Sequence, residues 1–119
     1  MNFTKQFLST APNGKFVAVV STNPASPTPV HATPAGLTSL DEVYLYATFN
    51  GIGTVPVTIY WGGTTANDAF TVNVQPAGAG RTLIADGRLL NNALAISAYT
   101  TSAGTVGGLL LDGFVNRLQ

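Results

Sequence analysis

Strict alternation of apolar and polar residues over 41–49 and 55–61 constrains the fold most. Every second residue carries an apolar side chain from Val43 to Phe49 and from Val55 to Trp61, and 69–74 continues the pattern. Successive side chains of a β-strand point to opposite faces of the sheet, so a period of two predicts strands with one buried face. We expect alternate strand residues to form the core, in particular Val57, Ile59, Phe70, Val72, Leu94 and Ile96.

Turn residues divide the remainder of the chain into further short strands. We expect strands at 15–20 and 94–100, a short strand that ends in a turn at Asp86-Gly87, and a glycine-interrupted strand or strand pair at 105–118. No long helical periodicity is present. About seven or eight short antiparallel strands predict an all-β fold, a single-domain β-sandwich or partly open barrel spanning residues 1–119.

Two segments depart from the strand pattern. In 1–13, Phe3, Phe7 and Leu8 are spaced for one side of a short helical turn, so this segment is either a turn over one end of the core or an arm that docks on a neighbouring molecule. Residues 21–36 contain four of the seven prolines. Proline cannot donate a hydrogen bond to a sheet, so this segment is a loop or an extended edge segment, and we expect a long surface loop.

The charge content limits the classes of partner. Only 8% of residues are charged and the formal net charge is zero, whereas soluble domains usually carry about 25%. Nucleic-acid binding needs clustered basic residues, and no apolar run is long enough to span a membrane, so neither partner is expected. There is no cysteine, which permits folding in a reducing cytoplasm, and no signal peptide is evident. A neutral surface suits a subunit that packs against neighbours.

No constellation of residues predicts catalysis, a metal site or a cofactor. The sole histidine, His31, falls in the proline-rich segment, where we expect it to be solvated, with no carboxylate or nucleophile placed beside it by sequence. Asp86 and Asp112 each precede a glycine, which is ordinary turn usage. The sequence therefore predicts a protein that is not an enzyme.

Aromatic residues are the candidate interface. Tyr44 and Tyr46 point away from the core side of their strand, as does Tyr60 beside Trp61, so neighbouring strands would place the tyrosines on one outer face. Ordinary cross-strand packing, a contact surface and a sugar-binding platform all remain open. Together with the N-terminal phenylalanines, the candidate interface residues are Phe3, Phe7, Tyr44, Tyr46, Tyr60 and Trp61.

The C-terminal third carries a resemblance. A hairpin-like LIADG at Leu83 to Gly87, an alternating strand at 94–100, a glycine-rich turn and a closing GFVNRL resemble the C-terminal strands of small β-rich bacteriophage virion proteins of the capsid decoration, or cement, type. The resemblance implies a structural protein with no catalytic residues. It would be made in the host cytoplasm and bound to the outside of the capsid as a homo-oligomer, trimer or dimer, bridging copies of the major capsid protein.

A second hypothesis comes from the aromatics alone. Trp61 with Tyr44, Tyr46 and Tyr60 also fits an Ig-like or carbohydrate-binding module of a phage tail or fibre, whose aromatic side chains would stack on sugars. The two hypotheses differ in the partner that the aromatic face contacts, protein in the first and glycan in the second.

Overall fold

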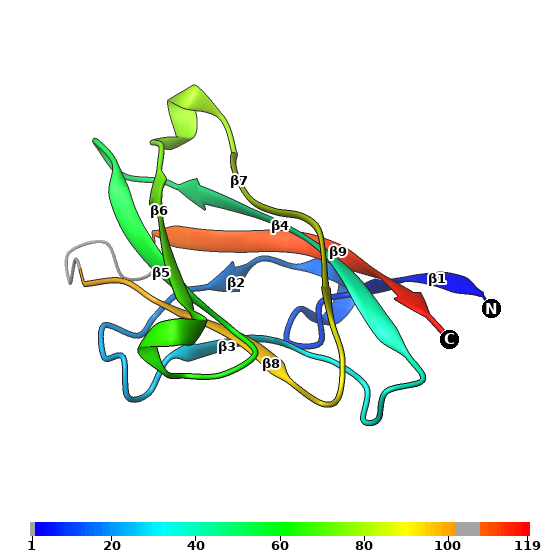
Figure 1. Ribbon diagram of the computed structural model, residues 1–119. Coiled ribbons are helices and arrows are strands. Elements are labelled where there is room, and N and C mark those ends of the chain that lie inside the picture. Colours follow the sequence, from blue (N-terminus) through cyan, green and yellow to red (C-terminus); the bar gives the residue numbers. More distant parts are fainter. Residues whose placement is uncertain (1, 102–107) are drawn as a thin grey trace.

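The computed structural model describes residues 2–101 and 108–119, and in them the chain forms two antiparallel β-sheets packed face to face (Figure 1). The predicted β-sandwich is confirmed, and the sheets do not close into a barrel. Sheet A contains β1 (Phe3–Phe7), β2 (Val17–Ala18), β4 (Leu40–Phe49), β7 (Thr82–Leu90) and β9 (Leu109–Leu118), and sheet B contains β3 (Thr28–Ala32), β5 (Val55–Trp61), β6 (Ala69–Val74) and β8 (Ala95–Tyr99).

The strand order is that of a jelly roll. Sheet A runs β1-β9-β4-β7, with β2 also paired to β9, and sheet B runs β3-β8-β5-β6. From β2 onward the strands pair first with last: β2 with β9, β3 with β8, β4 with β7 and β5 with β6. This pairing is produced when one long antiparallel ribbon wraps around a core, which defines the jelly-roll class of β-sandwich.

The core lies between the sheets and contains most of the predicted residues. Val57 and Ile59 are fully buried and Ile96 is 1% exposed, whereas Phe70 and Val72 are partly buried against the same cluster. The prediction for Leu94 is wrong, because its side chain is 40% exposed. Alternation would point Leu94 inward like Ile96. However, β8 begins only at Ala95, after a turn, so the alternation does not extend to Leu94.

Two predicted turns lie inside strands instead. Gly87, with a φ of 80°, falls within β7, where the register with β4 shifts and Val43 faces Arg88 while Tyr44 faces Asp86. The Asp86-Gly87 pair is therefore a β-bulge, in which a glycine adopts a positive φ at little cost.

The second predicted turn is Asp112-Gly113, and its glycine allows β9 and β4 to approach closely. Gly113 lies in the middle of β9, where an added Cβ would sit 2.0 Å from the carbonyl oxygen of Tyr44. The expectation of close backbone approach is confirmed here, although Asp112 is not in a turn. The first part of the predicted 105–118 segment, up to residue 107, lies outside the described residues.

Both segments that were not predicted as strands contain one. Phe3–Phe7 is β1, paired with Phe114–Leu118 of β9, so the helical-turn interpretation of 1–13 is wrong. Hydrogen bonds between Asn2 and Gln119 extend this pairing, and the two ends of the chain lie together (Figure 1). Residues 21–36 are likewise not one surface loop, because β3 lies within them and pairs with β8 at the edge of sheet B, as the alternative of an extended edge segment predicted. Conversely, the strand predicted at 15–20 is reduced to β2.

Candidate functional site

The outer face of sheet A gathers exposed aromatic and leucine side chains. Residues directly opposite each other in antiparallel strands lie on one face of the sheet. The register therefore places Phe7, Phe114 and Tyr44 in one row across β1, β9 and β4. Asp86 of β7 continues this row opposite Tyr44, and the rows on either side complete the set, which we call the sheet A outer face: Phe3, Lys5, Phe7, Leu40, Glu42, Tyr44, Tyr46, Leu83, Asp86, Leu89, Asp112, Phe114, Asn116 and Leu118.

The apolar members of this face are unusually accessible. Phe3, Phe7, Leu83 and Leu89 are 64%, 60%, 51% and 57% exposed. Burial of such side chains is the main driving force of protein association. Beside Phe7 the face is hollowed between β1 and β9, and the hollow is lined by Lys5, Gln6, Phe7, Gly14, Gly113 and Phe114. A face of this kind can receive apolar side chains from another protein.

Rigid contacts hold the centre of the sheet A outer face. The rings of Tyr44 and Phe114 stack, with centroids 4.7 Å apart. The Tyr44 hydroxyl donates to Glu42 Oε1 at 2.8 Å, and Asn116 Nδ2 donates to the same oxygen at 3.2 Å. These two hydrogen bonds lower the pKa of Glu42 below its usual value, and the bond to Glu42 raises the pKa of Tyr44. Glu42, Tyr44 and Asn116 are therefore already hydrogen-bonded within the chain before any contact forms.

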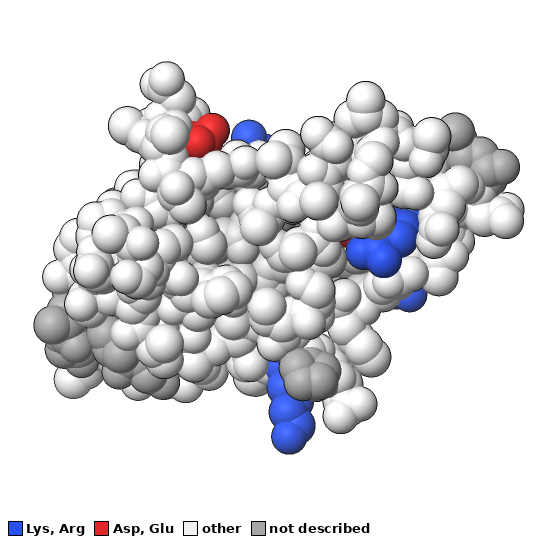
Figure 2. All heavy atoms as spheres, turned by 90° about the horizontal axis from the view of Figure 1, so that it is seen from below, with Lys and Arg blue, Asp and Glu red and all other residues white. Residues whose placement is uncertain are grey.

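Basic side chains cover several aromatic rings of the chain. Lys5 lies 4.8 Å from the centre of the Phe114 ring, and Arg81 lies 4.3 Å from that of Tyr46 while also pairing with Asp112 at 2.7 Å. These cation–π contacts occupy one side of each ring. Figure 2 shows one face of the molecule, on which most residues are uncharged and lysine or arginine side chains lie at a few separate places.

The structure brings together four of the six candidate interface residues. Phe3, Phe7, Tyr44 and Tyr46 all belong to the sheet A outer face. Tyr60, however, is on β5 of sheet B, so the expectation that it shares a face with the other tyrosines is wrong. The loop after β4 crosses from one sheet to the other, and β4 and β5 are not neighbours.

The other two aromatic candidates are engaged within sheet B. Tyr60 is 6% exposed and packs against Tyr99, with ring centroids 5.6 Å apart. Trp61 packs against Phe70, and Arg88 lies 4.8 Å from the Trp61 ring centre and 5.0 Å from that of Phe70. The four-residue aromatic platform on which the sugar-binding hypothesis rested is therefore not formed.

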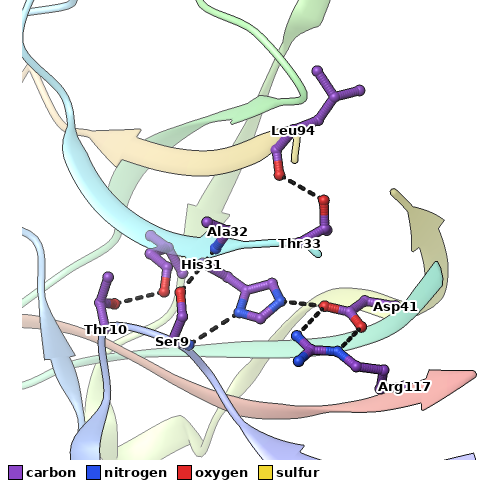
Figure 3. A network of polar contacts seen from close by, with 9 residues as sticks. Ser9, Thr10, His31, Ala32, Thr33, Asp41, Leu94 and Arg117 are labelled. Carbon is purple, nitrogen blue, oxygen red and sulfur yellow. Dashed lines mark hydrogen bonds and ion pairs between the residues drawn. The ribbon is translucent and has the colours of Figure 1, made fainter. Parts of the chain in front are cut away.

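A buried polar network joins the two sheets at the end of the sandwich where the chain termini lie (Figure 3). The expectation of a solvated His31 is wrong, because the residue is 2% exposed. Asp41 of β4 is fully buried and accepts from His31 Nε2 at 2.6 Å and from Arg117 Nε and Nη2 at 2.8 and 3.0 Å. Burial acts to raise the pKa of Asp41, but hydrogen bonds and charge from Arg117 and His31 outweigh it, and the pKa is lowered.

The network fixes the tautomer of the His31 imidazole and leaves this ring no catalytic partner. The Ser9 backbone N–H donates to His31 Nδ1 at 3.0 Å, so Nδ1 is unprotonated and Nε2 carries the proton that Asp41 accepts. Ser9 Oγ accepts from the Ala32 N–H at 2.8 Å instead of facing the imidazole. Nε2 thus holds β3 to β4, and Nδ1 holds β3 to the segment after β1, which makes the histidine a structural clamp between the sheets.

Sequence reasoning missed Phe114, Leu83 and Leu89 on the sheet A outer face. Counted along one continuous strand, Phe114 falls on the face opposite to Leu111 and Val115, which is the outer face. Interpreting Asp112-Gly113 as a turn hid this alternation. Leu83 and Leu89 lie on either side of the bulged part of β7, where the register shifts change the parity. The Asp41–His31 pairing had no signal, because it depends on a sheet-to-sheet contact.

Neither protein-family models nor curated protein sequences match this chain. Within residues 2–101 and 108–119 there is no grouping of three or more histidine, cysteine or acidic side chains that could hold a metal ion. Over the same residues no helix is long and apolar enough to cross a bilayer. The fold and the site define a jelly-roll β-sandwich with an exposed aromatic face.

Proposed function

We propose that the protein is a structural component of a bacteriophage virion, a decoration or cement protein that binds the outside of the capsid through its sheet A outer face. The observation that carries the proposal is the group of exposed Phe and Leu side chains on the sheet A outer face, where Glu42 and Asp112 already bind partners within the chain. The partner would be the major capsid protein, and the protein would reach the shell after synthesis in the host cytoplasm.

The fold supports this proposal without deciding it. Jelly rolls are common in viral capsid proteins and also in lectins and cupins, and one fold hosts many functions. A lectin would need open aromatic rings, whereas Tyr46 and Trp61 are each covered by an arginine. Exposed apolar side chains with polar groups around them are instead suited to protein–protein contact.

The effect on the shell follows from repetition. Each contact would bury apolar surface across the boundary between capsid subunits, and a shell bears many identical boundaries. Because a ligand that binds only the assembled state stabilises that state by mass action, occupancy of these sites would raise the temperature at which the shell opens.

The test compares capsid shells purified with and without the protein. Added protein is expected to co-sediment with bare shells and to raise their melting temperature in a dye-release assay. Replacing Phe3 and Phe7 together by serine is expected to weaken shell binding at least about tenfold, as for central apolar contacts in other interfaces.

A matched control uses exposed apolar residues away from the sheet A outer face. Leu37 and Ile52 are 74% and 100% exposed, and their replacement by serine is expected to leave shell binding unchanged. If the wild-type protein never co-sediments with shells, or if both double variants bind as well as wild type, the proposal is wrong.

A further inference from the structure

Edge strands expose unpaired backbone groups, and within residues 2–101 and 108–119 three of the four sheet edges are protected. The edge at β3 is covered by the chain that follows β1: Thr10 Oγ1 donates to the carbonyl of Val30 at 2.5 Å, and Ser9 Oγ accepts from the Ala32 N–H at 2.8 Å. Pro29 also removes a donor from this strand. No further strand can add there.

The two edges of sheet A have other structural features that disfavour the addition of a strand. β7 has two register shifts and includes Asp86 and Arg88, and bulges and charges both disfavour edge pairing. On the opposite side β2 is only two residues long and β1 carries Lys5 at its centre. Short edge strands and lysines are the usual means of preventing association.

The remaining edge strand, β6, has none of these protective features. Its sequence AFTVNV contains no proline and no charged residue, and it pairs with β5 without a register shift. Thr71 and Asn73 are both exposed. An uncharged, regular edge rich in β-branched residues is a template for another strand.

The register with β5 shows which backbone groups of β6 are free. Pro56 of β5 has no N–H, and its carbonyl accepts from Thr100 Oγ1 of the segment after β8 at 2.7 Å, so the polar groups of Pro56 point away from β6. Pro56 lies opposite Asn73, which makes this a non-hydrogen-bonded pair. Because such pairs alternate with bonded ones, the N–H and C=O groups of Asn73 and Thr71 face outward from the sheet edge.

We infer that the occupant of this edge is a second copy of the same chain, paired antiparallel through β6 about a twofold axis at Val72. In this register Thr71 lies opposite Asn73 of the second copy, and a bonded pair exchanges both N–H···O=C hydrogen bonds. The axis repeats the pair, so every outward group of Thr71 and Asn73 finds a partner. The two Val72 side chains, partly buried in each copy, meet across the axis.

This pairing joins the two B sheets into one continuous sheet. Its axis is perpendicular to the sheets, so the sheet A outer faces of both copies point to the same side of the dimer. The dimer itself does not depend on the proposed function, but if that function is right, both copies can contact one shell surface together.

The test is the mass of the full chain in solution, by sedimentation across a range of concentrations, for wild type and two variants. Thr71→Pro removes an outward N–H that β5 does not use, whereas the control Thr71→Val changes the side chain and keeps the N–H. The wild type and Thr71→Val are expected to dimerise. Thr71→Pro is expected to raise the dimer dissociation constant about tenfold to a hundredfold, since each dimer loses two hydrogen bonds.

Hydrogen exchange of the wild type supplies a second measurement, which can be used even if Thr71→Pro does not fold. The amides of Thr71 and Asn73 are expected to exchange slowly in the wild type at high concentration and faster on dilution. A wild type that stays monomeric at high concentration, a dimer that Thr71→Pro leaves intact, or fast exchange of both amides in the dimer would each overturn the inference. Shell binding can succeed or fail independently of these results.

Discussion

Replacing the buried carboxylate at the end of the sandwich, Asp41→Asn, tests whether the polar network holds the two sheets together. Asp41 accepts hydrogen bonds from His31 and from two nitrogens of Arg117. An asparagine side chain has one carbonyl oxygen and one NH₂ group. Whichever way it is turned, the NH₂ group faces a donor, so at least one hydrogen bond is lost and two donors oppose each other.

The size of the effect follows from burial. Breaking a buried ion pair by removing one partner typically costs about 3–5 kcal/mol, because the other charge is left uncompensated. The Asp41 side chain is fully buried, whereas the Arg117 side chain is 21% exposed and can recover some hydration. We therefore expect a loss near the lower end, about 3 kcal/mol of unfolding free energy, or roughly 10 °C in melting temperature for a chain of this size.

The assay is urea unfolding followed by circular dichroism at neutral pH. The matched control is Asp112→Asn, which removes the same charge from an ion pair whose arginine is 54% exposed, and exposed pairs contribute less than about 1 kcal/mol. The double variant Asp41→Asn/Arg117→Gln is expected to lose less than the sum of its single variants, since the two residues act on each other. Equal effects of Asp41→Asn and Asp112→Asn would refute the reasoning.

Three further predictions concern acid stability, backbone approach and the core. The pKa of Asp41 is lowered in the folded protein. Its contribution to the free energy of unfolding is therefore complete above the unfolded pKa of about 4 and is lost as pH falls through the folded pKa. Asp41→Asn should flatten the acid limb of a stability–pH curve, and an unchanged limb would contradict this. Gly113→Ala should cost about 3 kcal/mol or more, because its Cβ meets a backbone oxygen, whereas Gly78→Ala meets nothing and should stay within about 0.5 kcal/mol in thermal melts. Ile59→Ala should cost about 2–4 kcal/mol in urea unfolding and Leu94→Ala clearly less; similar losses would mean that burial does not set the difference.

The strands could be predicted from sequence because alternation reports burial directly. Where one face of a strand packs on the core, as from Val43 to Phe49 of β4 and along β5, every second residue is apolar, and those strands were correctly located. The same reasoning failed at Asp86-Gly87 and Asp112-Gly113, because a glycine after an aspartate is typical of a turn but also suits a bulge or a tight strand crossing. Local chemistry does not distinguish these cases, since the partner strand decides.

The candidate site could be predicted only in part for a related reason. Alternation placed Tyr44 and Tyr46 on an outer face, but which strands lie beside each other is set by the jelly-roll wrapping. Tyr60 was therefore assigned to the wrong sheet. His31 illustrates the limit most clearly: it sits among prolines, and only the pairing of β3 with β8 buries it beside Asp41.

The most direct test of the central claim is hydroxyl-radical footprinting of the protein free and bound to capsid shells. Oxidation reports the solvent exposure of aromatic side chains one by one. The proposed function predicts that Phe3, Phe7 and Tyr44 become protected on binding, while Tyr99, on the outer side of sheet B, keeps its reactivity. Protection of Tyr99 with no change at the two phenylalanines would show that the sheet A outer face is not what contacts the shell.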